Sequence, residues 1–251
     1  MLGLAPDVQI IDLTHDVTPH DVRAGALTLV RAVQYLPDAS VVLAVVDPGV
    51  GTERRLLAVD CEPATFLGPD NGLLAPAVAL LGGPRQVVEL TRDEYRLPAP
   101  GPTFAGRDVL APAAAHIARG GAIEDLGASI DPATLVPGIV GLPRDVPGGG
   151  IEADVWWVDR FGNCQLNVGP DELTAAGAEP GVTVEVRCGD RAKAARWVRT
   201  YADARPSELV LLVDSYGLVA LALDRRSAAA EYDLAPGSTV ILVPPGATVP
   251  S

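Results

Sequence analysis

Apolar runs of strand length alternate with stretches of helical periodicity in the first half of the chain. A helix is predicted from about 21 to 35, where apolar residues recur every three or four positions behind Asp21, a residue type that suits an N-cap. A second helix is predicted from about 109 to 119, before a Gly-Gly pair. The strand-like runs are rich in Val, Ile and Leu and cover residues 8–13, 40–46, 56–59 and 86–90. This alternation predicts an α/β domain with a mainly parallel sheet flanked by helices.

The hydrophobic pattern changes after a segment rich in Pro and Gly. Residues 132–150 hold four Pro and five Gly in nineteen positions, a composition that does not pack regularly. Beyond it only a short stretch near 171–176 is helical, and strand-like runs separated by turns cover 151–158, 183–187, 209–213, 219–223 and 239–243. These runs predict a small antiparallel β-barrel or sandwich. We therefore expect an α/β domain over 1–135, a linker over 136–150 and a β-barrel domain over 151–251.

Charge and composition narrow the class of protein. Nineteen Lys and Arg against 32 Asp and Glu give a net charge of −13, which disfavours nucleic acid and anionic membranes as partners. The longest apolar stretches are broken by Pro and Gly, and the first residues do not form a signal peptide, so we expect a cytoplasmic protein. The three cysteines are widely spaced, which excludes a disulfide scaffold, and no His, Cys and Asp set has the spacing of metal ligands.

Asp47 ends the most apolar strand-like run and opens the segment Asp-Pro-Gly-Val-Gly-Thr-Glu-Arg, which closes with Arg54. Ligands of open α/β sheets gather beyond the carboxyl ends of strands, so this segment is a candidate binding loop. A plain hairpin turn with a solvated Asp and Arg explains the same spacing slightly better. Turn and capping roles likewise explain three other polar segments, at 68–72, 103–108 and 159–163.

Taken in order, these segments resemble one family. The motifs are IIDLTHDVTPHDV, VVDPGVGTERR, PDNGLL, TFAGRDVLAPAAA, VDRFGNCQLNV and DSYGLVALA. Together they resemble the S-adenosyl-L-methionine (SAM) hydroxide adenosyltransferases, which are related to the SAM-dependent fluorinase and chlorinase. The resemblance covers nearly the whole chain.

The resemblance implies an activity and an assembly. Water attacks C5′ of SAM in line with the departing sulfur and yields adenosine and L-methionine. SAM is the substrate, and no metal or other cofactor takes part. Family members are homotrimers that bind SAM between the N-terminal domain of one subunit and the C-terminal domain of the next.

The resemblance also assigns residues. The family uses an Asp-Arg-His triad to orient and activate the water, and Asp47 and Arg54 match its first two members. The halogenating relatives lack this Asp-Arg pair, so its presence favours hydroxide over chloride or fluoride. Substrate contacts are expected from residues of both domains, namely His20, Pro48, Phe104, Gly106, Asp159, Phe161, Asn163, Tyr201, Ser215 and Tyr216.

Two positions depart from the family pattern. Ala105 stands where the family has the triad His, which implies weakened hydrolysis and, because the surrounding pattern is intact, favours an engineered His-to-Ala change. The family also begins with a strand carrying a Thr-Asp-Phe-Gly-like motif that binds the ribose, and Met1 falls after that point. Two alternatives to an impaired hydrolase stay open: a chlorinase-like halide adenosyltransferase, and a non-catalytic protein that binds SAM or adenosine.

Overall fold

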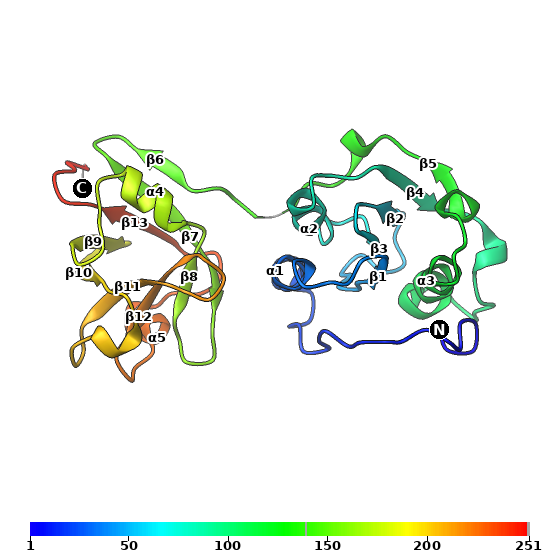
Figure 1. The fold of residues 1–251 in the computed structure, drawn as a ribbon, viewed down its shortest axis with the longest axis horizontal. Helices are drawn as coiled ribbons and strands as arrows, with labels where there is room; N and C mark the ends of the chain where they lie inside the picture. Colours follow the sequence, from blue (N-terminus) through cyan, green and yellow to red (C-terminus); the bar gives the residue numbers. More distant parts are fainter. Residues whose placement is uncertain (139, 250–251) are drawn as a thin grey trace. The chain divides into compact units, whose positions relative to one another are not determined.

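The computed structural model describes residues 1–138 and 140–249. The chain divides into two compact units, Met1–Ile139 and Val140–Ser251 (Figure 1). Within the described residues, no helix is long and apolar enough to cross a membrane.

The first unit is built on a mixed five-stranded sheet in the order β1-β3-β2-β4-β5. Its strands are β1 (Ser40–Leu43), β2 (Leu56–Asp60), β3 (Ala64–Pro69), β4 (Gln86–Leu90) and β5 (Gly127–Ser129). Only β1 and β3 run parallel; the other three pairings are antiparallel. The α/β class is confirmed, but the expected mainly parallel sheet is wrong. The three residues between β2 and β3 form a hairpin connection, and such a short link allows only antiparallel neighbours.

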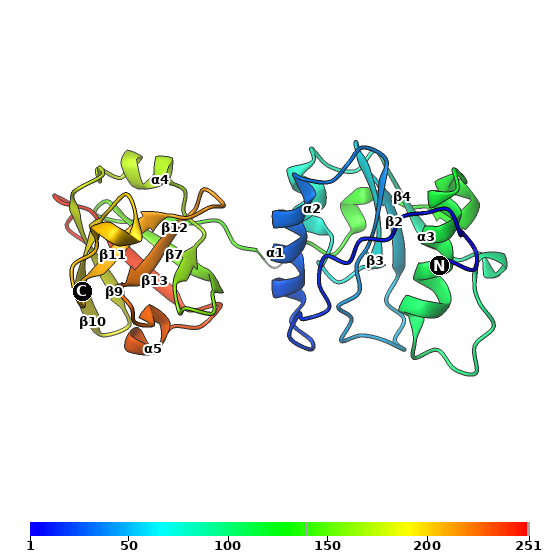
Figure 2. The same cartoon turned by 60° about the horizontal axis from the view of Figure 1, so that its bottom comes forward.

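Helices cover both faces of this sheet, as Figure 2 shows. Helices α1 (Val22–Val33) and α2 (Ala75–Leu80) pack with Leu57, Val59 and Val87, whereas α3 (Ala111–Ala118) packs with Ala58 and Val88 on the opposite face. Successive residues of β2 and β4 therefore serve different cores, as the two-residue period of a strand requires. A sheet with two buried faces gives rigid strand ends on which functional side chains can be placed.

Both predicted helices of the first unit are present. The Asp21 carboxylate accepts a hydrogen bond of 2.8 Å from the N–H of Ala24, so it caps α1 as predicted. The second predicted helix is α3, which continues from a π-helical turn over Gly106–Leu110. Short 3₁₀ turns lie at Asp93–Tyr95, Ile123–Leu126 and Pro132–Thr134.

In the first unit one predicted strand is absent and one central strand was not predicted. Residues 8–13 form no strand, and the side chains of Ile10 and Ile11 are exposed. β3, which the apolar pattern did not reveal, lies between β1 and β2 in the sheet and contains the fully buried Phe66 and Leu67. An apolar alternating run becomes a strand only where a neighbouring strand accepts its backbone hydrogen bonds, and that depends on distant segments.

The second unit is a closed barrel of seven strands, because β13 pairs with both β9 and β7. Its only parallel pairing within the described strands joins β10 and β11. Inward residues of β7, such as Ile151, Ala153 and Val155, alternate with outward ones around a single core. The strands are β7 (Gly150–Val158), β8 (Cys164–Leu166), β9 (Thr183–Cys188), β10 (Arg191–Trp197), β11 (Leu209–Val213), β12 (Val219–Leu223) and β13 (Thr239–Val243).

Short elements complete the second unit. The strand β6 (Arg144–Val146) pairs with β7 and lies inside the segment predicted as a linker, so part of that segment does pack regularly. Helix α4 (Pro170–Ala175) occupies the stretch where helix was predicted, whereas α5 (Ala228–Tyr232) and a 3₁₀ turn at Tyr201–Asp203 were not predicted. β8, β10 and β6 were also missed, since two are very short and β10 is rich in Ala and charged residues.

Candidate active site

Asp47 and Arg54 form a nearly buried ion pair just beyond the end of β1. The Arg54 Nε–H donates to both Asp47 oxygens, Oδ1 and Oδ2, at 2.7 Å, and Nη2 also contacts Oδ2. The exposed fractions of the two side chains are only 6% for Asp47 and 13% for Arg54. The pair is therefore a fixed, charge-assisted contact rather than the solvated turn that the spacing alone slightly favoured.

A compact turn brings the two partners together. Val50 donates its N–H to Asp47 C=O at 3.3 Å, and Thr52 donates both N–H and hydroxyl to Gly49 C=O, at 3.1 and 2.7 Å. A Cβ at position 49 would lie 3.1 Å from Cδ of Arg54 and 3.6 Å from Oδ1 of Asp47. Glycine therefore lets the Arg54 side chain lie across the turn and reach the carboxylate.

The segment 104–108 packs against the same strand end. A Cβ at Gly106 would lie 3.3 Å from Cγ2 of Val45, two residues before Asp47. Ala105 is buried beside it, and Phe104 is 59% exposed under the guanidinium of Arg107, which lies 4.7 Å from the ring centroid. The side chain that stands at position 105 is thus a methyl group with no polar atom.

Arg107 and Asp108 have a structural role. Arg107 Nε and Nη2 donate to Oδ1 and Oδ2 of Asp108 at 2.6 and 2.9 Å, and these bonds hold the pKa of the Asp108 carboxyl below its usual value.

His20 and Pro48 are both exposed. His20 has a φ of +69°, which is uncommon for a residue with a Cβ, and it lies directly before the cap of α1.

In the barrel, Asp159 organises the turn between β7 and β8. Its Oδ1 accepts the N–H groups of Phe161 and Asn163 at 2.8 and 2.9 Å, and its Oδ2 accepts the Asn163 amide at 2.8 Å. The same amide lies 3.5 Å from the Tyr201 hydroxyl. Phe161 is 66% exposed, so an apolar ring and a fixed amide stand side by side at this turn, a combination that can stack on and hydrogen-bond a planar ligand.

A second turn, between β11 and β12, carries Ser215 and Tyr216, both exposed. Asp214 begins it and accepts the N–H of Tyr216 at 2.8 Å, while its Oδ2 contacts the amide of the buried Gln165. Burial first, then the charges of Asp159 and Asp214, raise the pKa of Tyr201.

Sequence reasoning missed Asp214 and Gln165. Each predicted turn residue can be recognised from its own neighbourhood, because it is an aromatic or polar residue in a loop that contains glycine. Gln165 instead sits in a three-residue strand, and nothing local indicates that its amide reaches Asp214, 49 positions along the chain. A polar residue at an outward position between the inward Cys164 and Leu166 was the one available sign.

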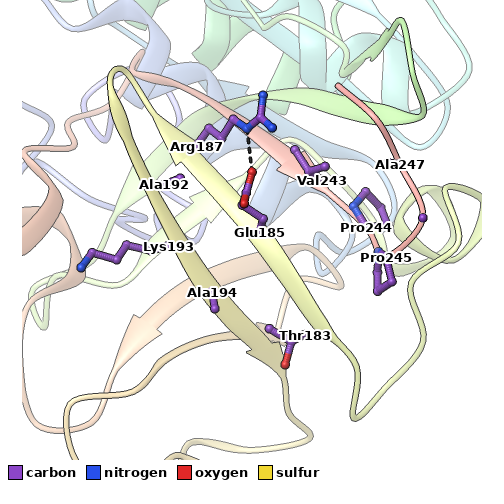
Figure 3. A pocket seen from close by; sticks show the side chains of 11 residues that line it. Thr183, Glu185, Arg187, Ala192, Lys193, Ala194, Val243, Pro244, Pro245 and Ala247 are labelled. Carbon is purple, nitrogen blue, oxygen red and sulfur yellow. Dashed lines mark hydrogen bonds and ion pairs between the residues drawn. The ribbon is translucent and has the colours of Figure 1, made fainter. Parts of the chain in front are cut away.

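The barrel also carries a groove. It is lined by β9, β10 and the segment after β13, and Figure 3 shows the Glu185–Arg187 ion pair within it, with Nε and Oε1 2.7 Å apart. None of the predicted site residues lines it. Within the described residues, no group of three or more His, Cys, Asp and Glu side chains could hold a metal ion.

Comparison with known proteins gives matches over both units. The model of the SAM hydroxide adenosyltransferase N-terminal domain matches residues 1–127, and that of the C-terminal domain matches residues 153–241. An (R)-S-adenosyl-L-methionine hydrolase of Salinispora tropica is 45% identical over 93% of this chain and 86% of its own length. A protein of the same name from Thermus thermophilus is 40% identical over 95% of this chain and 89% of its own length.

More distant relatives and a solved structure extend the likeness. A fluorinase of an Actinoplanes species is 27% identical over 96% of this chain and 89% of its own length. The crystal structure of an uncharacterized conserved protein from Thermotoga maritima matches 96% of this chain and 91% of its own, with a TM-score of 0.87 and 29% identity.

Proposed function

Because this chain belongs to the SAM hydroxide adenosyltransferase family, we propose that it hydrolyses SAM to adenosine and L-methionine. The observation that carries the proposal is the nearly buried Asp47–Arg54 pair at the end of β1. Relatives named as SAM hydrolases at 32–45% identity, against 26–27% for the fluorinases, support water rather than halide as the nucleophile.

The reaction requires that a water molecule is held in position and that this water loses one proton. The water oxygen forms a bond to C5′ while the C5′–S bond breaks, and sulfur keeps the electron pair and becomes the neutral thioether of methionine. The leaving group therefore needs no proton. The attacking water must lose one, and holding it in line with the C5′–S bond supplies much of the rate.

Asp47 is the residue proposed to orient this water and accept its proton. A carboxylate has about four lone-pair sites, and the three contacts from Arg54 leave capacity for a water molecule. The Arg54 guanidinium keeps the carboxylate in one orientation. The negative charge of Asp47 also attracts the sulfonium of SAM and repels a halide anion in the same site.

Ala105 is proposed to lower the rate. The family pattern has a His at this position, and the methyl group of Ala105 can neither hold nor move a proton. Asp47 is then the acceptor that remains for the proton of the water. The protein is expected to be a slow hydrolase rather than an inert one.

The barrel is proposed to bind the rest of the substrate. Asp159, Asn163 and Tyr201 supply polar groups at one turn, and Phe161 supplies an exposed ring for the adenine. Ser215 and Tyr216 are assigned to the methionine end. In this proposal the protein is a homotrimer, and the barrel of one copy completes the site of the next.

The test is to incubate the protein with SAM and to follow adenosine and methionine by HPLC, beside Ala105→His and Asp47→Asn. We expect Ala105→His to raise turnover by about 100-fold or more, the usual contribution of a general acid–base group, and Asp47→Asn to lower it by a similar factor. Chloride and fluoride are added in parallel reactions. Formation of a 5′-halo-5′-deoxyadenosine would contradict the hydrolase proposal, as would tight SAM binding without product in all three proteins.

A further inference from the structure

We propose that Asn71 is a positioning residue that holds the end of β1 and thereby sets the place of the Asp47 carboxylate. The inference rests on the proposed function, since it assigns Asn71 a role in the same site. Asn71 lies in the turn after β3 and is separated from Asp47 by 24 positions, so only the tertiary structure brings them close.

The side chain of Asn71 continues the contact between β1 and β3 where their regular pairing runs out. The paired register covers Ser40 to Leu43, and the N–H of Ala44 still donates to Leu67 C=O at 2.9 Å. Two residues further on, the Asn71 Nδ2–H donates to the C=O of Val46 at 2.9 Å. Val46 is bonded directly to Asp47, so this hydrogen bond fixes the peptide group from which the catalytic turn begins.

The second hydrogen bond of Asn71 makes its amide rigid. Oδ1 accepts the N–H of Leu73 at 3.1 Å, while Nδ2 faces the carbonyl of Val46. A carbonyl can only accept and an N–H can only donate, so a single orientation of the amide satisfies both contacts. The side chain therefore acts as a clamp between the 68–72 turn and the end of β1.

The turn that carries this clamp is itself anchored. The buried Asp70 carboxylate accepts Arg55 Nε–H through Oδ2 at 2.9 Å and the N–H of Val136 through Oδ1, also at 2.9 Å. Its own N–H donates to Arg55 C=O at 3.0 Å. Arg55 follows Arg54 in the chain, so the turn is tied to the guanidinium side of the catalytic pair, and Asn71 ties it to the carboxylate side.

A displaced nucleophile is costly in an in-line displacement, because a shift of about 1 Å can lower the rate by about 100-fold. Loss of the Asn71 clamp frees the Val46 carbonyl and lets the Asp47 turn move, while the substrate contacts proposed for the barrel stay intact. We therefore expect a loss in kcat with little change in the affinity for SAM.

The experiment compares Asn71→Ala and Asn71→Asp with Asn167→Ala. Asn71→Asp keeps the acceptor for Leu73 but turns an oxygen towards the Val46 carbonyl, so it removes the proposed contact and adds a negative charge. Asn71→Ala removes both contacts without adding a charge. Asn167 makes the same two kinds of bond in the barrel, donating to Gly141 C=O at 3.0 Å and accepting the N–H of Asp154 at 2.8 Å. It is therefore a matched control for the loss of an amide clamp.

Two measurements are made on each protein: kcat with the SAM dissociation constant, and hydrogen exchange of the amides of Val50 and Thr52. We expect both Asn71 variants to lose about 10- to 100-fold in kcat, to keep SAM affinity within about threefold, and to exchange these amides faster than the parent. Asn167→Ala should change neither quantity.

The outcomes separate the two proposals. If the parent releases no adenosine, the proposed function fails, and the exchange rates alone then decide whether Asn71 holds the turn. Unchanged exchange at Val50 and Thr52 in both variants overturns the inference. So does an equal loss of kcat in Asn167→Ala, because the effect would then follow from general destabilisation.

Discussion

Two hairpin turns of the barrel, at 159–163 and 214–218, share the pattern Asp-x-aromatic-Gly-x. In both, the Asp Oδ1 accepts the N–H groups of the third and fifth residues, at 2.8 and 2.9 Å in the first turn and at 2.8 and 3.2 Å in the second. In both, the backbone of the first and fifth residues is paired and the glycine has a positive φ, +83° and +78°. One local rule thus builds both turns.

The surroundings of the two turns differ. The fifth residue is Asn163 in the first turn, where its amide bonds to Asp159, and Leu218 in the second. The second oxygen of Asp159 is therefore held within its own turn, whereas that of Asp214 is held by Gln165 of the neighbouring strand β8. Both carboxylates therefore hold their turns in the same way, and the turns differ in the side chains that surround the second carboxylate oxygen.

The glycines give the largest expected contrast. A Cβ at Gly162 would lie 2.0 Å from Oγ of Ser227, the capping residue of α5, whereas a Cβ at Gly217 would meet nothing within 4 Å. Gly217→Ala should cost only the strain of a left-handed residue, about 1–2 kcal/mol, and Gly162→Ala that strain plus roughly 1–3 kcal/mol of steric conflict. Denaturant unfolding measures both values.

Equal losses for the two glycine variants would contradict the described packing of the first turn against α5. A double variant, Gly162→Ala with Ser227→Ala, provides the control. Compared with Ser227→Ala alone, which already lacks the α5 cap, it should recover only the part of the loss due to Oγ, because Cβ and Cα of residue 227 would still lie 2.5 and 2.7 Å from the new methyl group.

The fifth residue gives the next contrast. Asn163→Leu makes the first turn resemble the second and removes the amide proposed to bind substrate, so the dissociation constant for SAM should rise by about 10-fold or more. Leu218→Asn makes the converse change outside the proposed contacts and should leave that constant within about twofold. Isothermal titration calorimetry measures both. A weaker affinity for SAM in Leu218→Asn alone would mean that the proposed contact with adenine lies at the second turn and not at the first.

The smallest expected effect concerns Tyr201, whose pKa is raised by burial and then by the charges of Asp159 and Asp214. Removing either charge should lower that pKa, and Asp159→Asn should lower it more than Asp214→Asn because the Asp159 charge contributes more. The ultraviolet absorbance of the phenolate, as a difference from Tyr201→Phe, follows the titration. The reverse order of the two shifts would place the phenol nearer the second turn.

Local signals in the sequence predicted much of the fold and part of the site. Capping and periodicity predicted α1, and turn residues predicted the turn at 159–163, because these depend on neighbours a few positions away. The motif order predicted the family, which the comparisons confirm. The roles of the site residues stay predictions.

The tertiary structure alone decided which segments pair and which polar groups meet. Residues 8–13 have the composition of a strand but pair with no strand in the described part of the chain, whereas β3 pairs on both sides and is a strand despite its weaker pattern. The contacts of Asn71 with Val46 and of Gln165 with Asp214 join segments 25 and 49 positions apart. The composition of a segment or a short motif encodes its local conformation, such as a helix, a cap or a turn. Long-range contacts form only when the whole chain buries its core.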